Sequence, residues 1–245
     1  ALKLGLQSAR STVISEELSL PGDLLLRLSG YHQRFSNMTD MPPLGSSACA
    51  APPPPSLHGT TATLVRVADG QAYGMEVWLR RSVGWLSGWI SYTLSRSERS
   101  YPCGVRAADY DQTHVLQVVA QVRLPRGFVA GVRLQFNTGR PETLLPLETD
   151  SSAALQQTAD RSISDGLRNN IRLPNYVQLD IRLDKRWTFR RWYLHAFLEV
   201  VNATFSRTNL YLAYPASEDV AAGKREPELL GFNWILPSLG LRGGF

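Results

Sequence analysis

Apolar and polar residues alternate along most of this chain, and this period of two is the feature that most constrains its fold. Residues 177–184 read Val-Gln-Leu-Asp-Ile-Arg-Leu-Asp, and residues 128–137 read Phe-Val-Ala-Gly-Val-Arg-Leu-Gln-Phe-Asn. The same alternation runs through residues 86–95, 116–124 and 235–245. Successive side chains of a β-strand point to opposite faces, so each segment is a ribbon with one apolar and one polar face. The sequence therefore predicts an all-β chain.

About nine such ribbons follow one another, and their connections alternate in length. The ribbons lie near 2–17, 24–39, 60–81, 86–99, 112–124, 128–140, 174–187, 192–214 and 227–245. Short turns rich in Gly, Pro or charge lie at 21–23, 82–84, 125–127 and 188–191, and long links lie at about 40–59, 100–111, 141–173 and 215–226. A transmembrane antiparallel β-barrel has short periplasmic turns and long extracellular loops. A soluble β-sandwich, the alternative, gives no reason for this alternation.

Aromatic residues close to the short turns also favour the barrel. Trp78 and Trp85 flank one short turn, and Trp187, Trp192 and Tyr193 flank another. Barrels of the outer membrane carry girdles of aromatic residues at both interfaces. In lipid only a helix or a closed barrel satisfies every backbone polar group, and the chain has no run of about 18 apolar residues that could cross as a helix.

Composition and spacing give little support to other functions. The formal net charge is +5, but the basic residues are scattered, which argues against a nucleic-acid-binding face. The two cysteines and four histidines lack metal-binding spacing, so we predict no metal, no cofactor and no enzymatic activity. Cys49 and Cys103 fall in successive long links that both face the oxidising exterior in this topology, and we predict a disulfide between them.

Several stretches resemble the C-terminal part of a TonB-dependent outer-membrane receptor. They are residues 70–77 (Gly-Gln-Ala-Tyr-Gly-Met-Glu-Val), residues 88–98, residues 172–182 (beginning Arg-Leu-Pro-Asn-Tyr), and Asn202 with residues 235–240. The end of the chain, with Leu239, Leu241 and a terminal Phe245, resembles the signal by which the barrel assembly machinery recognises bacterial outer-membrane proteins. The resemblance covers nearly the whole chain.

The resemblance implies that residues 1–245 form a barrel section equivalent to roughly the last nine of 22 strands, around a lumen filled by a plug domain. Two free sheet edges would be unsatisfied in a bilayer. We therefore expect the plug, the TonB box and some thirteen strands to come from another chain or from an upstream segment. The implied function is ligand uptake without bond chemistry across the outer membrane of a Gram-negative bacterium, coupled to TonB through the plug, with the ligand left open. A barrel scaffold or secretion component without TonB coupling is the alternative, and a soluble lectin or enzyme domain is a third possibility.

The strand phases assign side chains to a polar lumen wall. This wall includes Glu76, Arg80, Arg133, Asp180, Arg182, Asp184 and Glu199. The order Asp180, Arg182, Asp184 on one face predicts a ladder of ion pairs rather than a metal site or a catalytic carboxylate pair. By their height near the outer mouth, we predict substrate-facing positions at Gln33, Ser95, Arg96, Asn137, Arg140 and Asn202.

Overall fold

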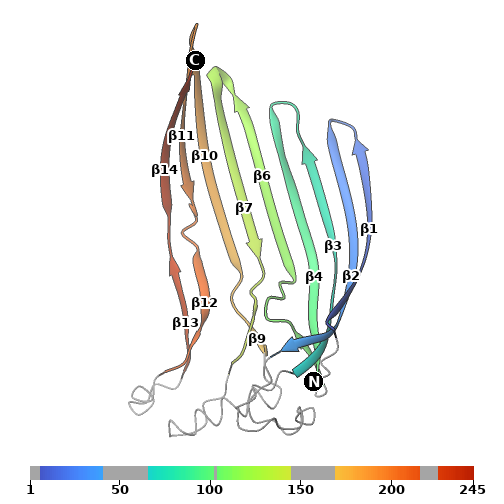
Figure 1. Cartoon of the computed structure of the whole chain (residues 1–245). Coiled ribbons are helices and arrows are strands. Elements are labelled where there is room, and N and C mark those ends of the chain that lie inside the picture. Colours follow the sequence, from blue (N-terminus) through green and yellow to red (C-terminus); the bar gives the residue numbers. More distant parts are fainter. Residues whose placement is uncertain (1–5, 41–65, 102–103, 145–168, 216–225) are drawn as a thin grey trace.

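The computed structural model describes residues 6–40, 66–101, 104–144, 169–215 and 226–245, and its main element is one antiparallel sheet. Figure 1 shows the sheet as a curved wall of long strands. In spatial order the strands are β1 (Ser8–Leu20), β2 (Leu24–Asp40), β3 (Arg66–Arg81), β4 (Leu86–Tyr101), β6 (His114–Leu124), β7 (Phe128–Asn137), β10 (Tyr176–Thr188), β11 (Tyr193–Val201) and β14 (Leu236–Gly244). The all-β antiparallel prediction is thus confirmed, and neighbours in sequence are neighbours in the sheet.

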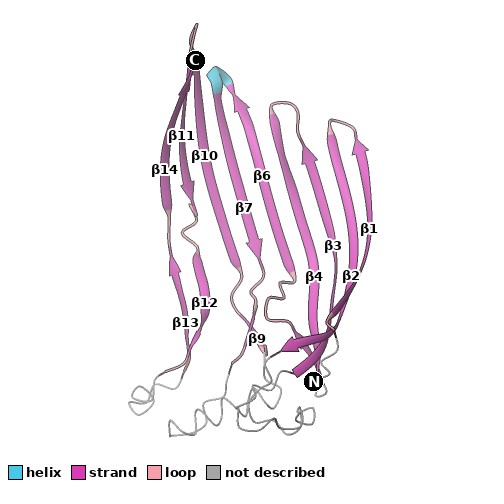
Figure 2. Cartoon of the chain, in the orientation of Figure 1, coloured by secondary structure: helices cyan, strands magenta, loops and turns pink. Residues whose placement is uncertain are grey.

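Short elements complete the described structure. They are β5 (Gly104–Ala107), which pairs with β4, the pair β8 (Pro141–Glu142) and β9 (Ile171–Arg172), and the pair β12 (Arg207–Ala213) and β13 (Glu228–Asn233). A 3₁₀ turn, η1 (Pro125–Gly127), joins β6 to β7 and is drawn in cyan in Figure 2. In the described parts of the chain, no helix is long and apolar enough to cross a membrane.

All four short turns lie at the same end of the sheet as the C-terminus (Figure 1). The turn between β1 and β2 reverses the chain in three residues, because Gly22 and Asp23 both adopt positive φ angles of 82° and 61°. At the turn between β6 and β7, Arg126 and Gly127 do the same, with φ angles of 62° and 76°. We call this the short-turn end, and the opposite end the long-link end.

The register gives the sheet two chemically different faces. On the polar face, successive strands bring together Arg27, Trp78, Ser91, Gln117, Gln135 and Gln178. On the apolar face, the next row brings together Leu26, Leu79, Ile90, Val118, Leu134 and Leu179. Directly opposed side chains share a face, so these rows confirm the alternation read from the sequence.

The apolar side chains do not pack into a closed core. Within the described ranges, Ala108 and Leu173 are the buried hydrophobic residues, whereas Leu198 is 51% exposed and Leu239 is 74% exposed. β1 and β14 are the edges of the main sheet and have no further neighbour among the described residues. A soluble sandwich needs a second layer to cover its apolar face, and the described residues do not supply one.

Three ribbons differ from their predicted form. The ribbons expected at 192–214 and 227–245 are each divided, into β11 and β12 and into β13 and β14. The first break lies at Asn202 and Phe205, whose φ angles of 55° and 52° leave the extended region. The ribbon expected at 2–17 extends to Leu20 and, as a strand, begins at Ser8.

Candidate functional site on the polar face

Asp180 is the most enclosed charged residue of the polar face, with 4% of its surface exposed. Its cross-strand partner Arg133 donates from Nε to Oδ2 at 2.6 Å and also forms an ion pair with that oxygen through Nη2. Oδ1 accepts from Gln178 Nε2 at 2.7 Å and from the backbone N–H of Asn202 at 2.8 Å. The hydroxyl of Tyr176 in turn donates to Gln178 Oε1 at 2.5 Å. The carboxylate therefore has three partners from three strands or strand ends, as a buried charge requires.

A second charged cluster follows along β10 toward the short-turn end. Arg182 donates from Nε and Nη2 to the two oxygens of Asp184, each at 2.9 Å, and from Nη1 to Glu199 at 3.3 Å. Nε2 of His195 lies 2.8 Å from Asp184 Oδ1. Cζ of Arg182 lies 3.9 Å from the ring centroid of Phe197, which places the cation over an aromatic face.

Ion pairs connect the residues for which the sequence predicts a ladder, with one difference in pairing. Arg182 pairs with Asp184 and Glu199, whereas Asp180 pairs with Arg133 on the neighbouring strand. Each carboxylate of β10 thus has its own arginine, so the three residues form two clusters. Among the described residues, no group of three or more His, Cys, Asp or Glu side chains is arranged to hold a metal ion.

Asn202 was predicted to face substrate, but it is fully buried, with 0% of its surface exposed. Its amide Nδ2 donates to the carbonyl oxygens of Ser206 at 3.0 Å and Trp234 at 2.7 Å. Its Oδ1 accepts from Ser206 N at 3.0 Å and Thr204 Oγ1 at 3.1 Å. These bonds use the whole amide of Asn202. The residue is therefore a structural link that joins the loop after β11 to the loop before β14.

At the long-link end, Asp111 and Arg172 form a clamp that the sequence analysis did not single out. Asp111 is 2% exposed, and its carboxylate forms an ion pair with Arg172 and accepts from Ser97 N at 2.6 Å. Arg172 Nη1 also donates to the carbonyl oxygens of Asp111 at 2.8 Å and Gly139 at 3.1 Å. Arg172 opens one of the family-like stretches, so its position was noted, but its partner lies 61 residues away and no local pattern pointed to it.

The other predicted substrate-facing residues lie near the long-link end but not on one surface. Gln33, Ser95 and Asn137 are on the polar face, and Ser95 Oγ donates to Gln112 O at 2.8 Å. Arg96 follows Ser95 and therefore lies on the apolar face, opposite Tyr73 and hydrogen-bonded to Glu98 at 2.6 Å. Arg140 lies beyond β7, where it contacts the carbonyl oxygen of Leu210. The structure therefore brings three of these residues onto the predicted wall and places Arg96 on the other side.

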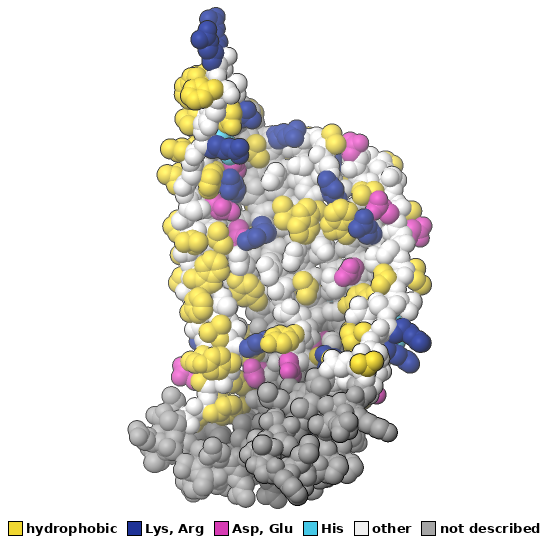
Figure 3. Space-filling view, in the orientation of Figure 1, with side chains coloured by type: hydrophobic (Ala, Val, Ile, Leu, Met, Phe, Trp, Pro, Cys, Tyr) yellow, Lys and Arg dark blue, Asp and Glu magenta, His cyan; other side chains and the backbone are white. Residues whose placement is uncertain are grey.

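The remaining predicted positions are distributed as follows. Glu76 and Arg80 lie on the polar face of β3, and Cζ of Arg80 is 5.9 Å from the ring centroid of Trp78. Leu239 and Leu241 are exposed on the apolar face of β14, and Phe245 at the chain end is exposed as well. Cys49 and Cys103 lie outside the described residues. Figure 3 shows Lys and Arg side chains at the short-turn end and patches of apolar side chains along the strands below them.

Two comparisons find no match: no protein-family model and no curated protein matches the sequence. Among solved structures, the chain is similar to the ferric-catecholate import receptor Fiu from E. coli K12 in its closed form, with a TM-score of 0.59 and 11% sequence identity. The similarity covers 97% of this chain and 28% of that receptor, so the chain spans less than a third of the receptor's length. At this identity the likeness shows the fold: an all-β antiparallel sheet that matches a section of that receptor and is not itself closed.

Proposed function

We propose that this chain is a section of the barrel of a TonB-dependent outer-membrane receptor, and that the assembled protein takes up a ligand without bond chemistry. The observation that carries the proposal is the pair of unlike faces: an exposed apolar face of long strands behind a polar face on which Asp180 and Asp184 form ion pairs with arginines. Lipid is the environment in which an uncovered apolar face of this kind is stable. The fold similarity to a receptor barrel supports the same conclusion.

The two edge strands run in the same direction, and this determines whether the number of missing strands is odd or even. β1 and β14 both run toward the short-turn end (Figure 1), because nine strands alternate in direction between them. Antiparallel closure at both edges therefore requires an odd number of additional strands. The thirteen strands expected for the remainder of a 22-stranded barrel meet this requirement, and closure would satisfy both edges in lipid.

The polar face would then line the lumen, against the plug domain and the ligand. Ion pairs join neighbouring strands there, Arg133 with Asp180 and Arg182 with Glu199, which suits a hydrated wall that keeps its shape. Under this proposal the long links face the cell exterior and TonB acts through the plug.

The test labels one residue from each face in the assembled protein. Cys49 and Cys103 are first replaced by Ser, and then Leu198→Cys and Gln117→Cys are made separately. Leu198 is on the apolar face and Gln117 on the polar face, both within long strands. We expect a membrane-soluble maleimide, but not a charged maleimide, to label Leu198→Cys, and the charged reagent to label Gln117→Cys. Labelling of both positions by the charged reagent, in protein extracted without detergent, would contradict the proposal.

A barrel scaffold or secretion component without TonB coupling shares this fold. A strain that lacks TonB separates the two functions, because only a coupled receptor loses ligand accumulation there. Retained accumulation in that strain would favour the uncoupled alternative.

A further inference from the structure

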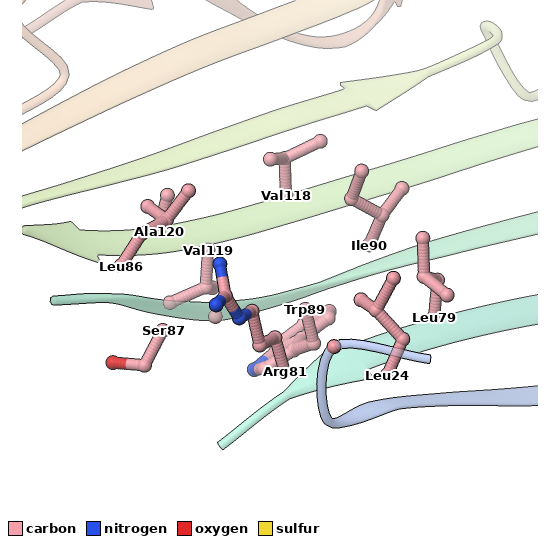
Figure 4. Close-up of a pocket in the computed structure, with 12 residues that line it drawn as sticks. Leu24, Leu79, Arg81, Leu86, Ser87, Trp89, Ile90, Val118, Val119 and Ala120 are labelled. Atoms are coloured by element: carbon pink, nitrogen blue, oxygen red, sulfur yellow. The ribbon is translucent and has the colours of Figure 1, made fainter. Parts of the chain in front are cut away.

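The apolar face contains a hollow of about 400 Å³ close to the short-turn end. Figure 4 shows Leu24, Leu79, Leu86 and Ile90 around it, together with Val118 and Ala120 of β6. The volume lies within the range of small-molecule sites, roughly 300–1,000 Å³.

Small residues in the register create the hollow. Arg81, Gly88 and Ala120 are direct cross-strand partners on β3, β4 and β6, so this row has almost no side-chain volume on β4 and β6. Larger side chains stand in the rows on both sides, such as Leu79 and Leu86. At Gly88 a Cβ would overlap the carbonyl oxygen of Val119, so glycine is required where β4 and β6 come this close. The hollow is therefore a consequence of the backbone, not of one rotamer.

One cation borders this apolar space. In Figure 4 the guanidinium of Arg81 lies among the lining residues, and its Nε is buried without a hydrogen-bond partner in the described structure. Three arginines of the polar face differ, because Arg27, Arg133 and Arg182 each form an ion pair with a carboxylate. An unpaired guanidinium beside an apolar hollow is complementary to a ligand with an anionic head and a hydrocarbon tail.

We propose that this hollow binds one phospholipid of the membrane leaflet at the short-turn end, with the phosphate on Arg81 and an acyl chain along the row of Gly88 and Ala120. The inference rests on the proposed function, because a lipid can reach this face only if the apolar side of the sheet lies in a bilayer. Arg81 is the residue directly before the turn at 82–85. A head group bound there would lie at the edge of the apolar band, at the level of the membrane–water interface.

The test measures lipid retained by the assembled full-length protein after extraction in mild detergent, by native mass spectrometry. Arg81→Gln removes the cation, Arg81→Lys keeps the charge, and Ala120→Phe fills the hollow. Lys185→Gln and Ala130→Phe are the matched controls, because both residues lie on the apolar face near the same end but outside the hollow. The probe for rebinding is phosphatidylglycerol in phosphatidylcholine vesicles, with inorganic phosphate alone as the second arm.

We expect wild type to retain one phospholipid, and retention to fall roughly tenfold in Arg81→Gln and in Ala120→Phe, with Arg81→Lys intermediate and both controls like wild type. Equal retention in Arg81→Gln and wild type, an equal loss in the controls, or binding of inorganic phosphate without lipid would overturn the proposal. If wild type is recovered in the membrane fraction in each of these cases, the barrel assignment survives and only the lipid site fails. Recovery of wild type in the soluble fraction would overturn both.

Discussion

The ring of Phe197 occupies the space in which residue 240 would carry a side chain. Phe197 and Gly240 are cross-strand partners on β11 and β14, and a Cβ added to Gly240 would overlap the ring. The same ring lies 3.9 Å from Cζ of Arg182. Gly240 therefore sets the position of a ring that in turn supports the charged cluster of β10 and β11.

A larger residue at this glycine should destabilise the protein. We expect Gly240→Val to lower the free energy of unfolding by about 1–3 kcal/mol, since Phe197 must leave its position. Gly243→Ala is the control, because its Cβ would meet only the carbonyl oxygen of Tyr193, at 3.5 Å. Urea unfolding followed by tryptophan fluorescence measures both variants, and equal loss in the two would contradict the role given to Phe197.

Loss of the Asp180 carboxylate should be costly, because three donors converge on it. In Asp180→Ala, Arg133, Gln178 and the N–H of Asn202 all lose their acceptor, and we expect about 3–5 kcal/mol of destabilisation. Asp180→Asn keeps an oxygen for Gln178 and Asn202 and loses only the ion pair, so its cost should be clearly smaller. The comparison is made on unfolding midpoints, and a ranking with Asn worse than Ala would be inconsistent with this network.

Substitutions at Asn202 can separate its backbone conformation from its hydrogen bonds. Its φ of 55° is accessible to Gly without strain, so Asn202→Gly should lose the amide contacts alone, whereas Asn202→Ala loses the contacts and also strains the backbone. We expect both variants to increase proteolytic cleavage near residues 202–207, and Ala to do so more. Thr204→Val, which removes a hydroxyl bonded to Asn202 Oδ1, is the milder control. Unchanged cleavage in Asn202→Ala would remove the argument for a structural link.

Glu98 lies in the last four residues of β4, beyond the roughly 9–11 residues that cross the hydrocarbon layer. The stability of the long-link end should depend on acid through this residue. Hydrogen bonds from Gln71 and then from Arg96 lower the pKa of the Glu98 carboxyl below its ordinary value of 4.5. A lowered folded-state pKa contributes stability that is fully present well above 4.5 and is lost as the pH falls through the lower folded-state value.

We therefore expect Glu98→Gln to be less stable than wild type at neutral pH and to differ from it less and less as the pH falls below 4.5. Thermal unfolding at a series of pH values measures this difference. Gln71→Leu should raise the pKa of Glu98 and move the loss to higher pH. A difference between wild type and Glu98→Gln that stays constant down to the lowest pH would rule out this origin.

The local period of two was sufficient to predict the main sheet. Alternation along Val177–Asp184 is enough to assign each side chain to a face, and in the sheet these side chains lie on the faces so assigned. The short turns were equally local, because Gly and Asp at 22–23 favour the positive φ values that reverse the chain.

The features missed are those that depend on partners distant in sequence. Asn202 binds the carbonyl oxygens of residues 206 and 234, and the sequence around Asn202 does not indicate that residue 234 is a partner. Ser95 and Arg96 were grouped by height along the strand, although the alternation itself puts neighbours on opposite faces. The hollow beside Arg81 needed the register of three strands before Gly88 and Ala120 became neighbours.

Because β1 and β14 run in the same direction, the ways in which this sheet can be closed into a barrel are limited. Two copies of the chain set side by side would bring together strands that point the same way at each seam, so duplication alone does not produce a uniformly antiparallel ring. Gain or loss of whole hairpins changes the count by two and preserves its oddness. The number of strands that closes this sheet into a barrel must therefore be odd, whichever of the two parts gains or loses hairpins.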